Sequence, residues 1–188
     1  MKLALTGAQS TGKTTLAKEL SKLFNLPLIT EQSRTVIKQF NVTAPKYLKE
    51  EELPDFQWKL FASQIIEEQS KKNFISDRCP TCFAAYASQF CKDETFIKEY
   101  AQKIENYLLL VKPYDLIIYV PPMFPIEDDG IRSSSEEVQH KTDLLIQHFL
   151  EMWKTKYGLN IMTINKASFQ GRIKQVENYI EDPLRLGI

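Results

Sequence analysis

The sequence predicts an α/β protein built on a parallel sheet, and two features of its pattern support this. Short apolar runs alternate along the chain with longer stretches in which apolar residues recur at helical spacing. The run Leu116–Val120 is apolar at successive positions, as expected for a strand that helices cover on both faces. No internal repeat or Gly/Ser linker interrupts the pattern, so we expect a single domain over residues 1–188.

Composition places the chain among ordinary globular proteins. Its 188 residues are enough to bury a core without disulfides or structural metals. Hydrophobic residues make up 43% and charged residues 26%, which argues against disorder. Lysine plus arginine equals aspartate plus glutamate at 24 each, and this zero net charge argues against a nucleic-acid partner. We therefore expect any phosphate binding to come from a local site.

Three features bear on the cellular location. The N-terminal segment Met1–Thr6 is too short for an export signal and leads directly into a glycine loop. No apolar stretch approaches the ~20 residues of a membrane span. The three cysteines lie in one segment and cannot all pair with one another, so we expect free thiols in a reducing cytoplasm. A homodimer is compatible with the sequence, which leaves the oligomeric state open.

The elements follow in order from the apolar pattern. Strands are predicted at Lys2–Thr6, Leu26–Thr30, Asn73–Asp77, Tyr114–Val120 and Leu159–Asn165. Helices are predicted at Gly12–Phe24, Gln32–Phe40, Pro54–Lys71, Pro80–Phe90, Thr95–Val111, Ser135–Tyr157 and Ser168–Ile180. The polar stretch Asn41–Leu53 and the proline-rich stretch Pro121–Ser134 are predicted to be loops.

The first strand is followed by Gly-Ala-Gln-Ser-Thr-Gly-Lys-Thr, which fits the phosphate-binding pattern G-x-x-x-x-G-K-[ST] at every fixed position. Glycines let the backbone wrap a polyphosphate with its N–H groups pointing inward. Lys13 brings a cation to the β- and γ-phosphates, and Thr14 offers a hydroxyl ligand to Mg²⁺. An apolar strand before the loop and an amphipathic helix after it argue against a chance match. The predicted contacts to ATP come from Gly7, Gln9, Ser10, Thr11, Gly12, Lys13, Thr14 and Thr15.

The end of the second strand brings Glu31 and, one helical turn on, Arg34. In an open parallel sheet, ligands bind at the carboxyl ends of the strands. Glu31 can accept a proton from an acceptor hydroxyl or hydrogen-bond a sugar hydroxyl. Arg34 can hold a phosphate or a carboxylate. The alternative is a surface pair at a helix start, where the helix dipole favours an acid.

The third strand closes on Asp77-Arg78. An acid at this position is expected either on Mg²⁺ or on the acceptor hydroxyl, and Arg78 can reach a transferring or acceptor phosphate. The alternative is a structural aspartate that caps the next helix. Base-reading residues are expected from the Asn41–Leu53 loop and the Pro54–Lys71 helix. The candidates are Tyr47, Phe56 and Trp58, which can equally belong to the core.

The loop after the fourth strand carries Asp128, Asp129 and Arg132. A loop with one arginine suits a lid that closes over ATP at residues 121–134 and places charge on the γ-phosphate. The two acids can orient Arg132 or bind a substrate hydroxyl. The alternative is a solvated surface loop.

Taken together, Gly7–Thr15, Glu31 with Arg34, and Asp128–Ser133 resemble the family of P-loop kinases and ATPases that includes the ribosylnicotinamide kinase domain. In that family an Asp-Asp-Gly-x-Arg-Ser stretch also follows the fourth strand and leads into a long helix. The resemblance spans nearly the whole chain in order and spacing, and the lid stretch is its most specific part.

A second, local resemblance involves Asp77-Arg78 and Ala85-Tyr86. They are similar to the thymidylate kinase segment Asp-Arg-Tyr-x-x-Ser-x-x-Ala-Tyr, in which the arginine binds the acceptor monophosphate. This chain has Cys79 in place of the tyrosine and Cys82 in place of the serine, which argues against a thymidylate kinase. Both resemblances imply a P-loop NTPase fold of the nucleotide-kinase type, with a five-stranded parallel sheet of order 2-3-1-4-5 and helices on both faces.

Residues and resemblances together predict a phosphotransferase that moves the γ-phosphate of ATP, with Mg²⁺, to a nucleoside or nucleoside monophosphate, including acceptors like nicotinamide riboside. Lys13, Asp77, Arg132 and Glu31 are the predicted catalytic residues, with Thr14 and Asp77 on the metal. Glu31, Arg34, Arg78, Asp128 and Asp129 are predicted to bind the acceptor. The alternatives are a regulatory P-loop ATPase and a nucleic-acid end kinase, and the zero net charge argues against the latter.

Overall fold

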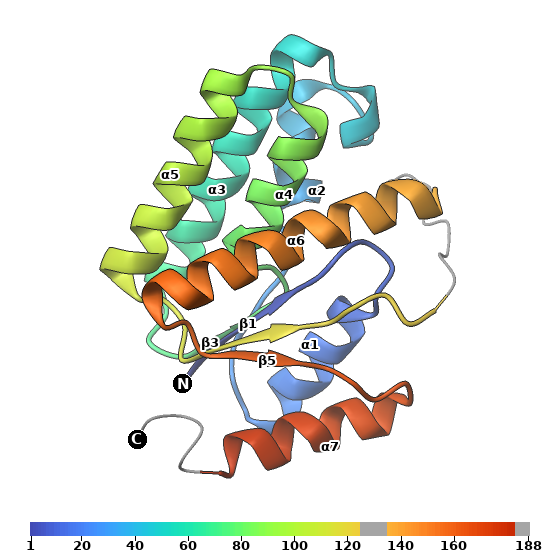
Figure 1. Cartoon of the computed structure of the whole chain (residues 1–188), viewed down its shortest axis with the longest axis vertical. Coiled ribbons are helices and arrows are strands. Elements are labelled where there is room, and N and C mark those ends of the chain that lie inside the picture. Colours follow the sequence, from blue (N-terminus) through green and yellow to red (C-terminus); the bar gives the residue numbers. More distant parts are fainter. Residues whose placement is uncertain (125–134, 183–188) are drawn as a thin grey trace.

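The computed structural model describes residues 1–124 and 135–182, and within them five parallel strands form one sheet of order β2-β3-β1-β4-β5 (Figure 1). The strands are β1 (Lys2–Thr6), β2 (Leu28–Ile29), β3 (Phe74–Ser76), β4 (Leu116–Tyr119) and β5 (Ile161–Thr163). This arrangement confirms the fold class and the strand order expected from the sequence.

Helices cover both faces of the sheet. On one face lie α1 (Lys13–Leu23) and α7 (Phe169–Ile180), which contact each other below the strands in Figure 1. The opposite face carries α3 (Leu53–Gln69), α4 (Pro80–Phe90), α5 (Glu94–Val111) and α6 (Glu136–Tyr157). None of the described helices combines the length and the apolar character needed to cross a membrane.

Side chains of successive strand residues separate the interior into two cores, because they point to opposite faces of a sheet. In β4, Leu116 and Ile118 pack with Leu16 and Leu20 of α1. Their neighbours in the strand, Ile117 and Tyr119, belong to the core under α4, α5 and α6. The run that is apolar at successive positions is therefore a strand buried on both faces, as predicted.

Several predicted strands and one predicted helix extend beyond the elements that the structure contains. β1 has its predicted bounds, whereas β2 to β5 are shorter than expected. Backbone bonds nevertheless continue beyond these strands: the Asp77 amide donates to the Ile29 carbonyl at 2.9 Å and the Val120 amide to the Thr6 carbonyl at 2.8 Å. The predicted helix Gln32–Phe40 is wrong as one element. It forms a single turn of α-helix, α2 (Ser33–Val36), and a 3₁₀ turn, η1 (Ile37–Phe40), each of which packs a side chain against α3.

The predicted loop Asn41–Leu53 also contains local structure. Two 3₁₀ turns, η2 (Pro45–Tyr47) and η3 (Glu50–Glu52), lead into α3. A third apolar cluster of Val36, Ile37, Phe56 and Leu60 packs α2 and η1 against α3. Val42 and Leu48 of the 41–53 segment pack against this cluster, and Leu48 lines a cavity together with Glu31 and Arg78, which follow β2 and β3.

Candidate functional site

The loop between β1 and α1 has the backbone geometry that a phosphate cradle requires. Gly7 has φ 147°, and a Cβ built there would lie 2.3 Å from the Val120 carbonyl oxygen. Gly12 caps α1 in the left-handed region with φ 84°. Both glycines are therefore needed for their conformation, and Gly7 also for its close approach to the strand next to it.

Lys13 points back into this loop. Its side chain is only 5% exposed, and its ammonium donates to the Ala8 carbonyl and, at 3.0 Å, to the Thr11 hydroxyl. The positive end of the α1 dipole points at the same space. The loop thus gathers backbone amides, a helix terminus and one ammonium group, which together suit a polyphosphate.

Thr14, the second residue of α1, contacts Asp77, which follows β3. The Thr14 hydroxyl donates to Asp77 Oδ2 at 2.7 Å, whereas Asp77 Oδ1 is buried and has no hydrogen-bond partner among the described residues. Burial raises the pKa of Asp77 above its ordinary value, although Arg78 and the Thr14 hydroxyl oppose the shift. A carboxylate oxygen without a partner beside a threonine hydroxyl fits Mg²⁺, which typically takes one or two carboxylates and completes its shell with water and phosphate oxygens.

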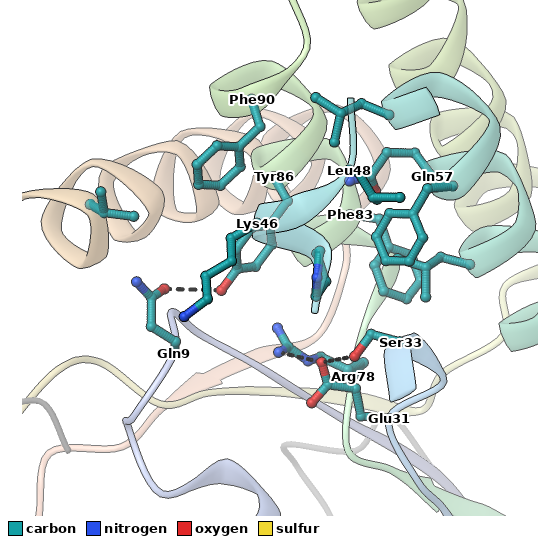
Figure 2. Close-up of a pocket in the computed structure, with 15 residues that line it drawn as sticks. Gln9, Glu31, Ser33, Lys46, Leu48, Gln57, Arg78, Phe83, Tyr86 and Phe90 are labelled. Atoms are coloured by element: carbon teal, nitrogen blue, oxygen red, sulfur yellow. Dashed lines mark hydrogen bonds and ion pairs between the residues drawn. The ribbon is translucent and has the colours of Figure 1, made fainter. Parts of the chain in front are cut away.

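Arg78 and Glu31 form a buried ion pair between the ends of β3 and β2. Arg78 Nη2 lies 3.0 Å from Glu31 Oε1, and the Ser33 hydroxyl donates to the same oxygen at 2.7 Å (Figure 2). The two side chains are 6% and 14% exposed. Burial is the largest single effect and disfavours the charged guanidinium. Glu31, Tyr86, Cys82 and Asp77 together outweigh it, so the pKa of Arg78 is raised well above its ordinary value.

Above this ion pair is a cavity of about 250 Å³. Its upper wall is apolar and aromatic, as Figure 2 shows for Phe83, Tyr86 and Phe90, with Phe56 also on the lining. Tyr86 and Phe90 are stacked, with ring centroids 6.0 Å apart. Apolar walls above a charged floor suit a ligand with a flat ring at one end and a polar group at the other.

Gln9 joins this cavity to the phosphate loop. It belongs to the loop, yet its side chain lines the cavity and accepts a hydrogen bond from the Tyr86 hydroxyl at 3.0 Å (Figure 2). Its backbone carbonyl accepts from Gln139 of α6 at 2.7 Å. Gln9 is therefore fixed from both sides, and the cavity opens directly beside the phosphate cradle.

The structure brings most of the predicted site residues together. Glu31, Asp77 and Arg78 converge with Lys13 and Thr14 at the carboxyl ends of the strands. Arg34 is different: its side chain is exposed on α2 and does not line the cavity. The predicted lid residues Asp128, Asp129 and Arg132 lie outside the described residues.

The three residues predicted to read a base lie in different places. Phe56 lines the cavity, whereas Trp58 packs in the core with ring centroids 4.9 Å from Tyr100 and 6.1 Å from Phe96. Tyr47 is 59% exposed and does not line the cavity.

Phe83 and Tyr86 of α4, two aromatic residues whose place in the core or at a ligand the sequence leaves open, both line the cavity. Gln57 was missed altogether. It lines the cavity at 4% exposure, and its side-chain carbonyl oxygen has no partner among the described residues. The sequence did hold a signal for Gln57, because it is a polar residue beside Phe56 and Leu60 in a helix whose apolar residues pack inward.

A family model described as an AAA domain matches residues 2–172 of the chain. No curated protein sequence gives a match. Among solved structures, the NadR protein in complex with NAD and AMP-PNP is similar, with a TM-score of 0.68 and 16% identity. That alignment covers 99% of this chain and 49% of NadR, so the chain spans about half the length of that protein.

Two nucleoside and nucleotide kinases have similar structures along nearly their whole length. Deoxyadenosine kinase from M. mycoides, with the products dCMP and dCDP bound, gives a TM-score of 0.65 at 19% identity and covers 96% of this chain and 99% of its own. Thymidylate kinase from Candida albicans gives 0.63 at 19% identity, covering 98% and 92%. At these identities the likeness is one of fold, and it confirms the fold resemblance expected from the sequence.

Proposed function

The chain belongs to the AAA domain family, and from this premise we propose that it is a kinase that transfers the γ-phosphate of ATP, with Mg²⁺, to a hydroxyl group of a nucleoside. The observation that supports this most directly is the contiguity of two sites. A phosphate cradle of P-loop geometry opens at Gln9 into a cavity with an ion pair on its floor. We take the whole chain as one kinase domain, since one sheet carries both sites.

On the donor side, the loop amides and Lys13 hold the β- and γ-phosphates. Thr14 and Asp77 would hold Mg²⁺, and the ion would supply positive charge to the phosphate oxygens. The unsatisfied oxygen of Asp77 then gains a partner. This accounts for an acid whose burial would otherwise be costly.

On the acceptor side, Glu31 is placed to take the proton of the attacking hydroxyl. The acceptor oxygen forms a bond to the γ-phosphorus, the bond from that phosphorus to the bridging oxygen of ADP breaks, and the proton passes to the Glu31 carboxylate. Arg78 and Ser33 fix the position of this carboxylate. Arg78 can then also stabilise the charge of the transferring group.

The upper cavity suits a nucleobase. Phe56, Phe83 and the stacked Tyr86 and Phe90 offer aromatic surfaces to a flat ring. Gln57 offers a side-chain carbonyl oxygen that has no partner in the part of the chain that the structure describes, and a base amino group can satisfy it by donating a hydrogen bond. Rings that carry both an aromatic face and an N–H donor therefore match the lining.

The charge of the floor favours a nucleoside over a nucleoside monophosphate. Arg78 is buried and already neutralised by Glu31 at 3.0 Å. A phosphate dianion placed beside this pair would meet the Glu31 carboxylate as well as the guanidinium, and like charges at such distances repel strongly in a buried site. A neutral hydroxyl can donate to Glu31 without disturbing the pair.

An ADP-release screen tests this function. With Mg·ATP, we expect nucleosides, including ribo-, deoxyribo- and nicotinamide ribosides, to accelerate ADP release more than their monophosphates do. Lys13→Ala should abolish the reaction, and Lys18→Ala, an exposed change on the same helix, should not. Acceptor-independent ATP turnover would indicate a regulatory ATPase instead. Stimulation only by polynucleotide ends would indicate an end kinase.

A second variant tests the proton acceptor. Glu31→Gln should lower kcat by about 10²–10⁴-fold while leaving the affinity for Mg·ATP unchanged. Glu51→Gln, an exposed acid in η3, serves as the control. A loss confined to the nucleoside KM would assign Glu31 to sugar binding and contradict the proton-transfer role.

A further inference from the structure

Arg172 lies in the first turn of α7 and is 2% exposed. Its Nη1 donates to the Thr11 carbonyl of the phosphate loop at 2.9 Å, and its Nε donates to the Lys166 carbonyl at 3.0 Å. Its third nitrogen, Nη2, is buried and has no partner among the described residues. One face of the guanidinium lies 4.8 Å from the ring centroid of Phe124. The side chain is thus fixed on the phosphate loop with one donor unused.

The charge of Arg172 also lacks a counterion. No carboxylate forms a salt bridge with it within residues 1–124 and 135–182. Burial lowers its pKa below the ordinary value, which is the expected effect when no acid compensates. A buried cation is costly unless an anion pairs with it. Lys13 and the N-terminus of α1 add further positive charge to the loop that Arg172 contacts through Thr11. A polyphosphate that extends from the loop to Arg172 would therefore relieve all three.

The sheet order determines which part of an ATP molecule lies near Arg172. Glu31 and Arg78 follow β2 and β3, on one side of the central strand β1. Phe124 follows β4, and Arg172 follows β5, on the other side. In-line transfer requires the γ-phosphate to face the acceptor cavity. The α-phosphate and the nucleoside of the donor must then extend toward the β4–β5 side.

From this geometry we propose that Arg172 is a donor-nucleotide-binding residue, which braces the phosphate loop through Thr11 with Nη1 and donates from Nη2 to the α-phosphate of ATP. Gly12 is part of the same arrangement, since a Cβ there would lie 3.3 Å from Arg172 Nη1. This inference rests on the proposed function for the identity of the donor as a nucleotide and for the direction in which the donor extends from the acceptor cavity.

Direct binding measurements without any acceptor test the assignment. The probes are Mg·ATP, Mg·ADP and inorganic pyrophosphate, which can satisfy Lys13 and the loop amides without reaching Arg172. For Arg172→Gln we expect affinity for ATP and ADP to fall by about 10-fold or more, as expected for a charge-assisted hydrogen bond, while pyrophosphate affinity changes little. Lys174→Gln, an exposed change on the same helix, should leave all three affinities unaltered.

Two outcomes would overturn the assignment: an equal loss for all three ligands, which would leave Arg172 as a brace of the loop alone, or no loss for any. Thermal unfolding without ligand checks that the variants are folded. Arg172→Lys provides a second variant that keeps the positive charge, and it should retain part of the ATP affinity. Because no acceptor is present, loss of ATP binding with Arg172→Gln would stand even if the acceptor screen failed.

Discussion

Two buried carboxyl groups in this chain differ in how their oxygens are satisfied. Glu68 Oε1 accepts from Gln64 at 2.6 Å and from Tyr114 at 2.7 Å, and its Oε2 accepts from Tyr107 at 2.7 Å. Asp77 has one oxygen bonded to Thr14 and the other without a partner among the described residues. At the residue scale this contrast separates an acid that belongs to the core from one suited to a cation.

Replacing Asp77 with asparagine tests its assignment to the metal. The amide oxygen of Asp77→Asn can still accept the Thr14 hydrogen bond, but the charge that attracts Mg²⁺ is gone. We expect the Mg²⁺ concentration for half-maximal ATP turnover to rise about 10- to 100-fold. Titration of turnover with MgCl₂ measures this, with the exposed change Asp55→Asn as the control. An unchanged Mg²⁺ dependence would remove Asp77 from the metal site.

The buried carboxyl group of Glu68 should make the stability of the chain depend on pH. Burial raises its pKa above the ordinary value of 4.5, although bonds from Gln64, Tyr107 and Tyr114 oppose the shift. The folded chain therefore binds this proton more tightly than the unfolded chain does. Its contribution to stability is complete below pH 4.5 and is lost as the pH rises through the raised pKa.

The variant Glu68→Gln, which cannot ionise, isolates that contribution. Relative to this variant, the native chain should lose stability from pH 4.5 to neutral pH. The loss is about 1.4 kcal/mol for every tenfold difference between the folded and unfolded proton affinities. Urea unfolding of both proteins across this range measures the difference. If the free energies of unfolding of the two proteins differ by the same amount at every pH, the pKa of Glu68 is the same in the folded and unfolded chain.

At the scale of elements, the turn from β1 into α1 depends on backbone conformation more than on side chains. Gly7 has φ 147° and faces the Val120 carbonyl, whereas Gly158 at the end of α6 has φ 65° with nothing near its missing Cβ. Both positions favour glycine, but only the first is also sterically closed. The two therefore form a matched pair of substitutions.

Gly7→Ala should destabilise the chain by at least about 3 kcal/mol, because a clash with a backbone oxygen of the next strand adds to the strained φ. Gly158→Ala carries only the conformational cost, about 1–2 kcal/mol. Extrapolated free energies of unfolding in urea compare the two. Similar losses would mean that the loop relaxes away from Val120.

The elements that could be predicted from sequence are those with a local signal. The phosphate loop follows from fixed residues, and β4 from a run that is apolar at successive positions. The split of residues 32–40 into two short turns was missed because it depends on packing with Phe56 and Leu60 of α3. Tertiary contacts of this kind override local propensity and leave no periodic pattern.

The candidate site shows the same division. Lys13, Thr14, Asp77 and Glu31 could be predicted because they follow strands or lie in a motif. Arg172 could not, since its contact with Thr11 joins residues far apart in the chain. The aromatic wall of the cavity could not be told from core either, because aromatic residues such as Phe83 and Tyr86 pack equally well against a core or a ligand.

On the scale of the whole molecule, the central strand lies between the two proposed binding sites. Residues after β2 and β3 form the floor of the cavity proposed to hold the acceptor, and the 41–53 segment with α3 and α4 forms its walls. Residues after β4 and β5 meet the phosphate loop from the other side. Gln9 lies between them, bonded to Tyr86 of α4 and to Gln139 of α6. This arrangement suits two ligands bound end to end across one loop.

A molecule that joins both ligands tests this arrangement. Adenosine linked through a polyphosphate to a nucleoside should bind about 10²-fold or more tightly than ATP, because the second half binds at high effective concentration. At saturating ligand the gain also appears as a higher unfolding temperature. Phe90→Ala, which shortens the wall of the cavity, should reduce this gain and leave ATP affinity unchanged. If the cavity and the phosphate loop serve one reaction, both must bind a ligand that spans them. A linked molecule that binds no better than ATP would therefore show that they do not serve one reaction.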